Sequence, residues 1–253
     1  MDEQQLQPAP PSATAPTAAW LSKLEAPGPG APRGFSAAAR LLHPATDADL
    51  DPVGWADVAA VTGHSLNPDS TFDDIAGTVH TRRTTRNDWP GGPPDLGELG
   101  DTGWDALLSH LARYSGSSTR CLIAVDDSLT WVTGGPGVQF SGDPHHVEPP
   151  QDPAFSSWLL NSTPRLRVSS RSYLLLTAPL DALRTVGRTW RYQDQRWFER
   201  HSPSLLWPLD RSWLVLTDLD QDYTYIAGPR VLLDAVLADP RLEAQPQDTT
   251  PPF

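Results

Sequence analysis

The sequence predicts an α+β fold with a mixed or mainly antiparallel sheet, several short helices, long Pro/Gly-rich loops and disordered termini. Segments with helical and with strand periodicity alternate along the chain, but without the strict strand–helix–strand rhythm of a parallel sheet. The 27 Pro and 18 Gly of the 253 residues gather between these segments, where they favour turns and connections.

The ends of the chain differ in composition from the middle. Residues 1–34 are rich in Pro, Ala, Gly and Ser/Thr, and the Pro/Gly run 26–33 can neither hold a helix nor join a sheet ladder. We expect a disordered tail over 1–34, in which residues 20–24 form either a docking patch or an apolar turn. A single α+β domain is expected over 35–243. The segment 244–253 predicts a second disordered tail.

Three segments in the first half have helical features. Residues 36–43 (SAAARLLH) predict a short helix. Residues 51–62 predict a second helix, because Asp-Pro suits a helix start and an apolar i, i+3, i+4, i+7 stripe runs up to Gly63. A third helix is predicted over 102–115, ending at Gly116.

Two strands and two long connections are predicted around these helices. Residues 64–100 hold few apolar side chains and predict a connection on the surface. The continuous apolar run 121–125 (CLIAV) is typical of a strand buried on both faces. After a turn, 129–133 predicts the returning strand of a hairpin. Residues 134–164 are rich in Gly and Pro and form either a long loop or an insertion.

The last third of the chain has the most regular patterns. Apolar alternation and apolar centres predict strands over 165–169, 171–177, 211–219 and 223–227. Pro at a first helical turn and a following apolar stripe predict helices over 179–186 and 229–238.

Composition excludes several classes of protein. No run approaches the ~18 apolar residues of a membrane span, and the first residues lack the positive charge and apolar core of a signal peptide. We therefore expect a cytoplasmic protein with no membrane partner. The single Cys121 excludes a disulfide framework and predicts a buried, inert thiol. A net charge of -12 argues against a general nucleic-acid binder.

One block of the C-terminal third resembles a known group of sequences. The motif Trp-Pro-x-Asp-Arg-x-Trp at 207–213, an Asp-x-Asp-x-x-Tyr strand and a Gly-Pro-Arg helix start are similar to a group of uncharacterised actinobacterial proteins. The helix at 55–60 and the stretch 89–94 also fit this group. All basic residues except Lys23 are Arg, as expected for a high-GC actinobacterial coding sequence. The resemblance covers about 35–243 and implies no activity.

The densest group of polar and aromatic side chains lies within 197–213. Trp can wall a pocket, Arg can bind an anionic group and His can act as an acid or base. The alternative is structural, with the Trp side chains as core anchors and Asp210 as a turn cap. The residues selected on this basis as tentative binding residues are Arg191, Trp197, His201, Trp207, Asp210, Arg211 and Trp213.

The segment 184–200 interleaves Arg with aromatic residues. This composition is typical of a surface that binds single-stranded nucleic acid. It also suits contacts with an acidic protein or ion pairs within the chain. Because the rest of the chain has an excess of acidic residues, we favour internal or protein contacts.

Motifs for metals and catalysis are weak. Asp218, Asp220 and Asp222 would share one face of a strand, which favours a solvated edge over a cation site because the Gly and Glu of an EF-hand loop are missing. The group 143–148 lacks the His spacing of a zinc enzyme. No phosphate-binding loop and no Gly-x-Ser-x-Gly motif occurs. We expect no metal and no cofactor.

These observations favour a non-catalytic module that binds another protein, in an immunity-type or adaptor role. One alternative is an enzyme of unrecognised type that uses His201, Asp210 and Arg211. The other is nucleic-acid binding through 184–200.

Overall fold

The structure is a computed structural model. It describes residues 5–24, 26, 30–80, 85–134, 153–192 and 195–249, with only the backbone of residues 191, 192 and 195. Its helices are α1 (Thr14–Lys23), α2 (Trp55–Thr62), α3 (Phe72–Ala76), α4 (Asp101–Ser115), α5 (Thr130–Thr133), α6 (Ser157–Ser162) and α7 (Arg230–Leu237), with the 3-10 helices η1 (Pro11–Ala13) and η2 (Leu180–Thr185).

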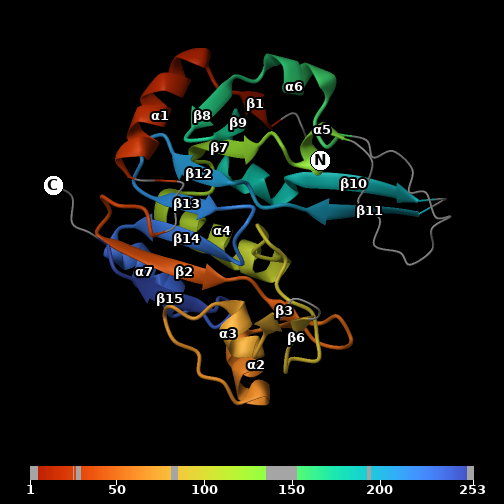
Figure 1. Cartoon of the computed structure of the whole chain (residues 1–253). Helices are drawn as coiled ribbons and strands as arrows, with labels where there is room; N and C mark the ends of the chain where they lie inside the picture. Colours follow the sequence, from red (N-terminus) through yellow and green to blue (C-terminus); the bar gives the residue numbers. More distant parts are fainter. Residues whose placement is uncertain are drawn as a thin grey trace.

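One large sheet forms the centre of the fold. Its strands are β1 (Gln7–Pro8), β2 (Ala37–Leu42), β7 (Arg120–Asp126), β8 (Arg165–Val168), β9 (Arg171–Pro179), β12 (Leu205–Pro208), β13 (Leu214–Thr217), β14 (Tyr223–Gly228) and β15 (Ala244–Gln247). The order is β1-β9-β7-β12-β13-β14-β2-β15, and β8 also pairs with β9 (Figure 1). Each pair is antiparallel. The predicted α+β class with a mainly antiparallel sheet is confirmed.

Three two-stranded pairs stand apart from this sheet among the described residues. They are β3 (Ala45–Thr46) with β4 (Pro52–Val53), β5 (Val79–His80) with β6 (Thr85–Arg86), and β10 (Gly187–Tyr192) with β11 (Gln195–Arg200). In Figure 1 the β10–β11 hairpin extends to the right, beyond the strands of the sheet.

Both faces of the sheet are buried. Along β7, Cys121, Ile123 and Val125 join a core with α4 and α7, whereas Leu122 and Ala124 join a second core with α1. This alternation follows from the pleat of a strand, and it confirms the predicted strand over 121–125. Burial raises the pKa of the Cys121 thiol to about 12, so this thiol is buried as expected.

A third apolar cluster is formed around α2 and α3, the two helices that lie below the sheet in Figure 1. The indole N–H of Trp55 donates to the carbonyl of His43 at 2.8 Å and fixes α2 against the end of β2. Helix α2 ends at Gly63, which has a φ of +77°, as predicted. It begins after Gly54 instead of at Asp51-Pro52, because Pro52–Val53 pairs with Ala45–Thr46.

Two predicted elements are wrong. The segment 36–43 contains a strand instead of a helix, because β2 is paired on both edges, with β14 and β15. Its Ala-rich composition favours a helix only weakly, and sheet pairing overrides that preference. The segment 129–133 contains helix α5 instead of a hairpin strand. Strand β7 could not accept it, since β9 and β12 occupy both of its edges.

The two expected tails also differ from the structure. Within 5–24, β1 pairs with β9, and α1 buries Thr17 and Leu21 against the sheet. At the other end, 244–247 pairs with β2. Pro is compatible with both segments because it is tolerated in the first turn of a helix and on an edge strand.

In the C-terminal third, the strands predicted over 165–169, 171–177 and 223–227 are confirmed as β8, β9 and β14. The helix predicted over 229–238 is confirmed as α7. The predicted strand over 211–219 is shorter, as β13, and the predicted helix over 179–186 is the 3-10 helix η2. Strand β12 and the β10–β11 hairpin were not predicted. Residues 135–152, which make up most of the predicted loop or insertion, lie outside the described residues, as does the group 143–148.

Candidate functional site

The β10–β11 hairpin begins at a position that only Gly can occupy. A Cβ atom on Gly187 would lie 2.1 Å from the carbonyl oxygen of Glu199 and 2.8 Å from the ring of Phe198. This close approach lets the two strands pair from Gly187–Arg200 up to Tyr192–Gln195.

One face of the hairpin is ordered by its own side chains. The register places Trp190 opposite Trp197, and their rings stack with centroids 6.1 Å apart. The guanidinium of Arg188 lies 3.5 Å from the centroid of the Trp190 ring. The carboxylate of Glu199 accepts from Arg188 Nε at 2.7 Å and from the Trp190 indole N–H. These contacts hold the side chains in fixed positions.

Two large side chains of this hairpin face solvent. Trp197 is 47% exposed and Phe198 is 42% exposed. As neighbours on one strand they point to opposite faces of the hairpin. The hairpin thus presents one large, partly exposed aromatic side chain on each of its faces.

A cavity of about 350 Å³ lies at the base of the hairpin, where β11 meets the start of α4. His201 is part of its wall and is buried. Its Nδ1 lies 2.6 Å from Glu98 Oε1, and its ring stacks on Trp131 with a centroid distance of 4.5 Å. The other Glu98 oxygen accepts from the backbone N–H of Ser202 at 2.8 Å. Glu98 therefore anchors the chain just after the hairpin.

Two carboxylates determine the charge of His201. Burial alone would lower the pKa of His201, but contacts with Glu199 and Glu98 outweigh it and raise this pKa. In return, contacts with His201, Trp190 and Arg188 outweigh the burial of Glu199 and lower its pKa to about 2. The site thus favours an imidazolium held between two carboxylates.

Arg side chains near the cavity pair with carboxylates of the same chain. Arg200 lies 2.8 Å from Asp105 and 3.5 Å from Asp101, and Arg184 lies 2.5 Å from Asp105. Together with the pair of Arg188 and Glu199, these contacts account for three of the Arg residues in the segment 184–200.

Of the predicted site residues, Trp197 and His201 both line this cavity. The side chain of Arg191 lies outside the described residues, although its backbone belongs to β10. Sequence reasoning missed Glu98, because it is distant in the chain and carries no local motif.

The remaining four predicted residues lie elsewhere. Trp207 and Trp213 are fully buried, in the cores on opposite faces of the sheet. Asp210 accepts from the backbone N–H of Ser212 in the turn after β12, and the Arg211 guanidinium lies 4.9 Å from the centroid of the Trp20 ring.

This placement corrects the grouping of His201 with Asp210 and Arg211. His201 precedes β12, whereas Asp210 and Arg211 follow it, so the three lie toward opposite ends of an extended strand. Neither Asp210 nor Arg211 lines the cavity beside His201.

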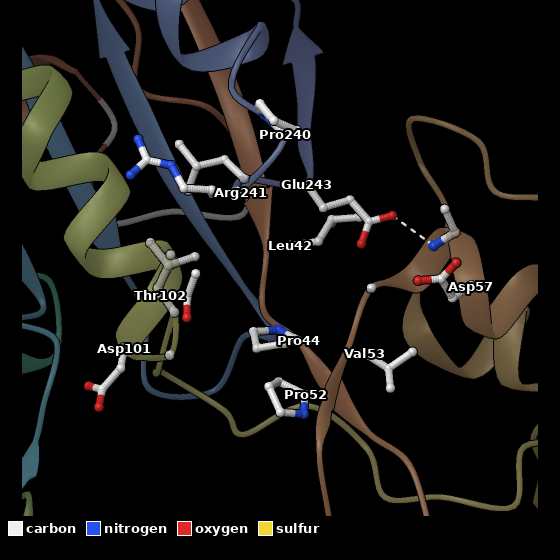
Figure 2. A pocket seen from close by; sticks show the side chains of 16 residues that line it. Leu42, Pro44, Pro52, Val53, Asp57, Asp101, Thr102, Pro240, Arg241 and Glu243 are labelled. Carbon is white, nitrogen blue, oxygen red and sulfur yellow. Dashed lines mark hydrogen bonds between the residues drawn. The ribbon is translucent and has the colours of Figure 1, made fainter.

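A larger cavity, of about 610 Å³, adjoins the first at Gly100 and Asp101 (Figure 2). Figure 2 shows Glu243 pointing across it toward the start of α2, where the carboxylate accepts from the backbone N–H groups of Trp55 and Ala56 at 2.5 and 2.7 Å. Glu243 thereby caps α2. Of the other charged residues in its wall, Arg241 pairs with Asp239 at 2.6 Å.

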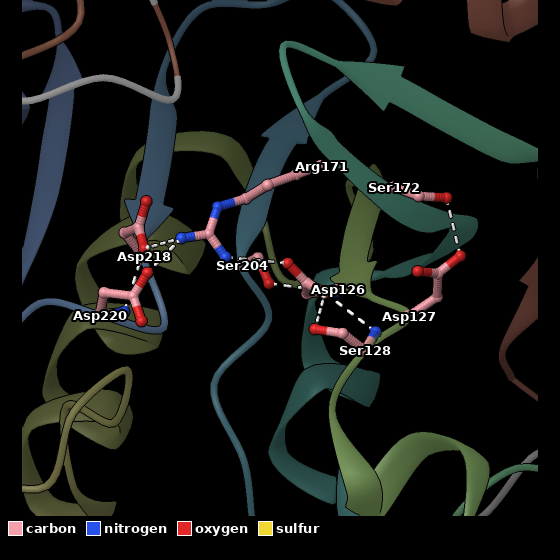
Figure 3. Close-up of polar contacts among 8 residues, drawn as sticks. All are labelled: Asp126, Asp127, Ser128, Arg171, Ser172, Ser204, Asp218 and Asp220. Atoms are coloured by element: carbon pink, nitrogen blue, oxygen red, sulfur yellow. Dashed lines mark hydrogen bonds and ion pairs between the residues drawn. The ribbon is translucent and has the colours of Figure 1, made fainter.

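The predicted acidic edge is an ion-pair network (Figure 3). Asp218 and Asp220 lie in the turn after β13, at 2.9 and 2.5 Å from Arg171, which also lies 3.3 Å from the buried Asp126. Asp222 is separate, and burial raises the pKa of its carboxyl group. The three carboxylates therefore do not share a solvated strand face.

Within the part of the chain that the structure describes, no group of three or more His, Cys, Asp or Glu side chains is placed to hold a metal ion. None of the helices in that part has the length and apolarity needed to cross a bilayer. Comparisons of the chain with protein-family models, curated proteins and solved structures find no match. The resemblance to the actinobacterial group therefore stays a prediction.

Proposed function

We propose that the protein is a non-catalytic module that binds another protein through the β10–β11 hairpin. The observation that carries this proposal is the exposure of Trp197 and Phe198 on an ordered hairpin outside the main sheet. Trp is enriched among the residues that dominate binding energy at protein interfaces. Because Trp190 stacks on Trp197, little side-chain entropy is lost on binding.

The state of His201 favours this proposal over an enzyme. A catalytic acid or base must reach its substrate, whereas His201 is buried, stacked on Trp131 and bonded to Glu98. The other two residues of the enzyme hypothesis, Asp210 and Arg211, lie beyond the far end of β12. We therefore assign His201 a positioning role at the base of the hairpin.

The ion pairs of the segment 184–200 favour a protein partner over nucleic acid. Binding to phosphates requires Arg side chains that can replace counterions. Arg184, Arg188 and Arg200 already contact carboxylates of this chain. The proposed role is that of an adaptor or immunity-type protein in the cytoplasm. The net charge of -12 attracts a basic partner.

The proposal can be tested by affinity capture from the native lysate with the wild-type protein and two matched variants. Trp197→Ala removes the exposed Trp of the hairpin. Trp158→Ala removes a Trp on α6 that is 64% exposed. We expect the wild type and Trp158→Ala to retain one stoichiometric, nuclease-resistant partner and Trp197→Ala to lose it.

A photo-crosslinking residue at the exposed position Arg196 should form a covalent product with that partner. The same residue at Val231, which is exposed on α7, should not. Equal capture by both Trp variants would refute the hairpin as the docking element. Capture that nuclease abolishes would support the nucleic-acid alternative.

A further inference from the structure

The cavity beside His201 has an excess of negative charge. The carboxylates in its wall belong to Asp95, Glu98, Asp101 and Glu199. Its two cationic groups already have anionic partners, since His201 lies between Glu98 and Glu199, and Arg200 contacts Asp105. The exposed Asp95 and Asp101 remain, and Asp101 has only a 3.5 Å contact with Arg200.

Aromatic rings stand at the same cavity. Trp197 and Phe198 line it, and each is more than 40% exposed. The face of an aromatic ring attracts a cation, most strongly for Trp, and also packs on the aliphatic part of a Lys or Arg side chain. Carboxylates and aromatic faces in one cavity form a recognised combination for binding organic cations.

His201 in the wall fixes two of these carboxylates. It is 8% exposed, and its ring nitrogens lie 2.6 Å from Glu98 Oε1 and 3.4 Å from Glu199 Oε2. An incoming cation therefore meets the exposed carboxylates of Asp95 and Asp101.

We propose that this cavity receives a basic side chain, Lys or Arg, of the protein partner. The cationic end lies against the carboxylates of Asp95 and Asp101, and the rest of the side chain packs on the aromatic residues that line the cavity. This inference rests on the proposed function and specifies the residue that the partner inserts.

The full-length protein can be tested with small probes, without knowledge of the partner. The probes are the Nα-acetyl methylamides of arginine and lysine, with the citrulline derivative as the uncharged analogue of arginine. The indole N–H signal of Trp197, assigned with Trp197→Phe, reports binding in an NMR titration. We expect a saturable shift for a cationic probe with a Kd of about 1 mM, and affinity for citrulline at least about tenfold weaker.

A pair of charge-matched variants locates the site. Asp95→Asn combined with Asp101→Asn should weaken binding of the cationic probe about tenfold. Asp49→Asn combined with Asp69→Asn changes the net charge equally at exposed positions outside both cavities, and should leave the affinity unchanged. Equal losses in the two variants, equal affinity for citrulline, or no saturable shift would each overturn the inference.

These results separate the inference from the proposed function. If Trp197→Ala abolishes partner capture while the probes show no preference for charge, docking through the hairpin is supported and the cavity does not bind a basic side chain. If the probes bind as expected but Trp197→Ala captures the partner normally, the cavity binds cations but the hairpin is not the docking element.

Discussion

Trp207 and Trp213 are joined by one tight turn, yet they pack in the cores on opposite faces of the sheet. The two indole groups differ in their hydrogen bonds. The N–H of Trp213 donates to Ser115 Oγ at 2.8 Å, whereas the N–H of Trp207 is buried without a partner among the described residues. Both side chains are fully buried, but only the Trp213 indole forms a hydrogen bond with a described residue.

This difference predicts unequal effects of the same substitution. Trp213→Phe removes the hydrogen bond to Ser115, while Trp207→Phe deletes an N–H that has no partner among the described residues. We expect Trp213→Phe to lower the free energy of unfolding by about 1 kcal/mol more than Trp207→Phe. Urea unfolding of the two variants measures this difference, and the reverse order would contradict the assigned hydrogen bonds.

Arg171 connects the start of β9 with β7 and with the turn after β13 (Figure 3). Arg171→Ala leaves the buried Asp126 without its cationic partner, and loss of one partner of a buried pair is strongly destabilising. Since Arg171 is itself partly exposed, we expect a loss of about 2–3 kcal/mol in the free energy of unfolding.

Adding Asp126→Asn to Arg171→Ala should recover part of this loss, because the uncompensated buried charge is removed. Recovery is partial, since the contacts of Arg171 with Asp218 and Asp220 are still lost. A double-mutant cycle measured by chemical denaturation gives the coupling. Strict additivity of the two substitutions would show that the pair does not interact.

The core strands were predictable because their local pattern matches their surroundings. The run 121–125 is apolar at every position, and the strand it forms is buried on both faces. The helix at 230–237 likewise follows a Pro and carries a clear apolar stripe. In contrast, 36–43 is a strand because of partners that lie far away in the chain. Local periodicity contains no information about such partners.

The candidate site was predictable only in part, for the same reason. Trp197 and His201 were visible in a dense polar and aromatic segment. The group that fixes His201 is Glu98, and the stacking partner is Trp131. Both come from distant segments without a motif. Trp207 and Trp213 were selected on residue type, although burial determines whether a Trp can bind a partner.

Gly187 offers a test of the hairpin that leaves its exposed side chains in place. Gly187→Ala places a Cβ atom 2.1 Å from the carbonyl oxygen of Glu199, so the two strands must move apart at their base. We expect faster hydrogen exchange of the amides over 187–200, unchanged protection of β7, and reduced partner capture. Gly30→Ala is the matched control, because its Cβ would meet no atom within 4 Å. Unchanged exchange over 187–200 in Gly187→Ala would refute the tight pairing.

The His201 site predicts a defined dependence of stability on pH. Because the pKa of His201 is raised in the folded protein above the ordinary value of 6.5, its contribution is fully present below that value. It is lost as the pH rises through the raised pKa. The pKa of Glu199 is lowered from 4.5 to about 2. Its contribution is therefore present above 4.5 and is lost as the pH falls toward 2.

His201 and Glu199 therefore both stabilise the folded state most strongly between about pH 4.5 and 6.5. His201→Gln should lower the free energy of unfolding by about 1–3 kcal/mol within this window, and the difference from the wild type should shrink as the pH rises toward 9. Denaturant unfolding at a series of pH values measures it. His80→Gln, at an exposed histidine in contact with the exposed Asp73, is the control and should have little effect throughout. A difference for His201→Gln that grows with pH would show that folding favours the neutral imidazole, contrary to the contacts with Glu98 and Glu199.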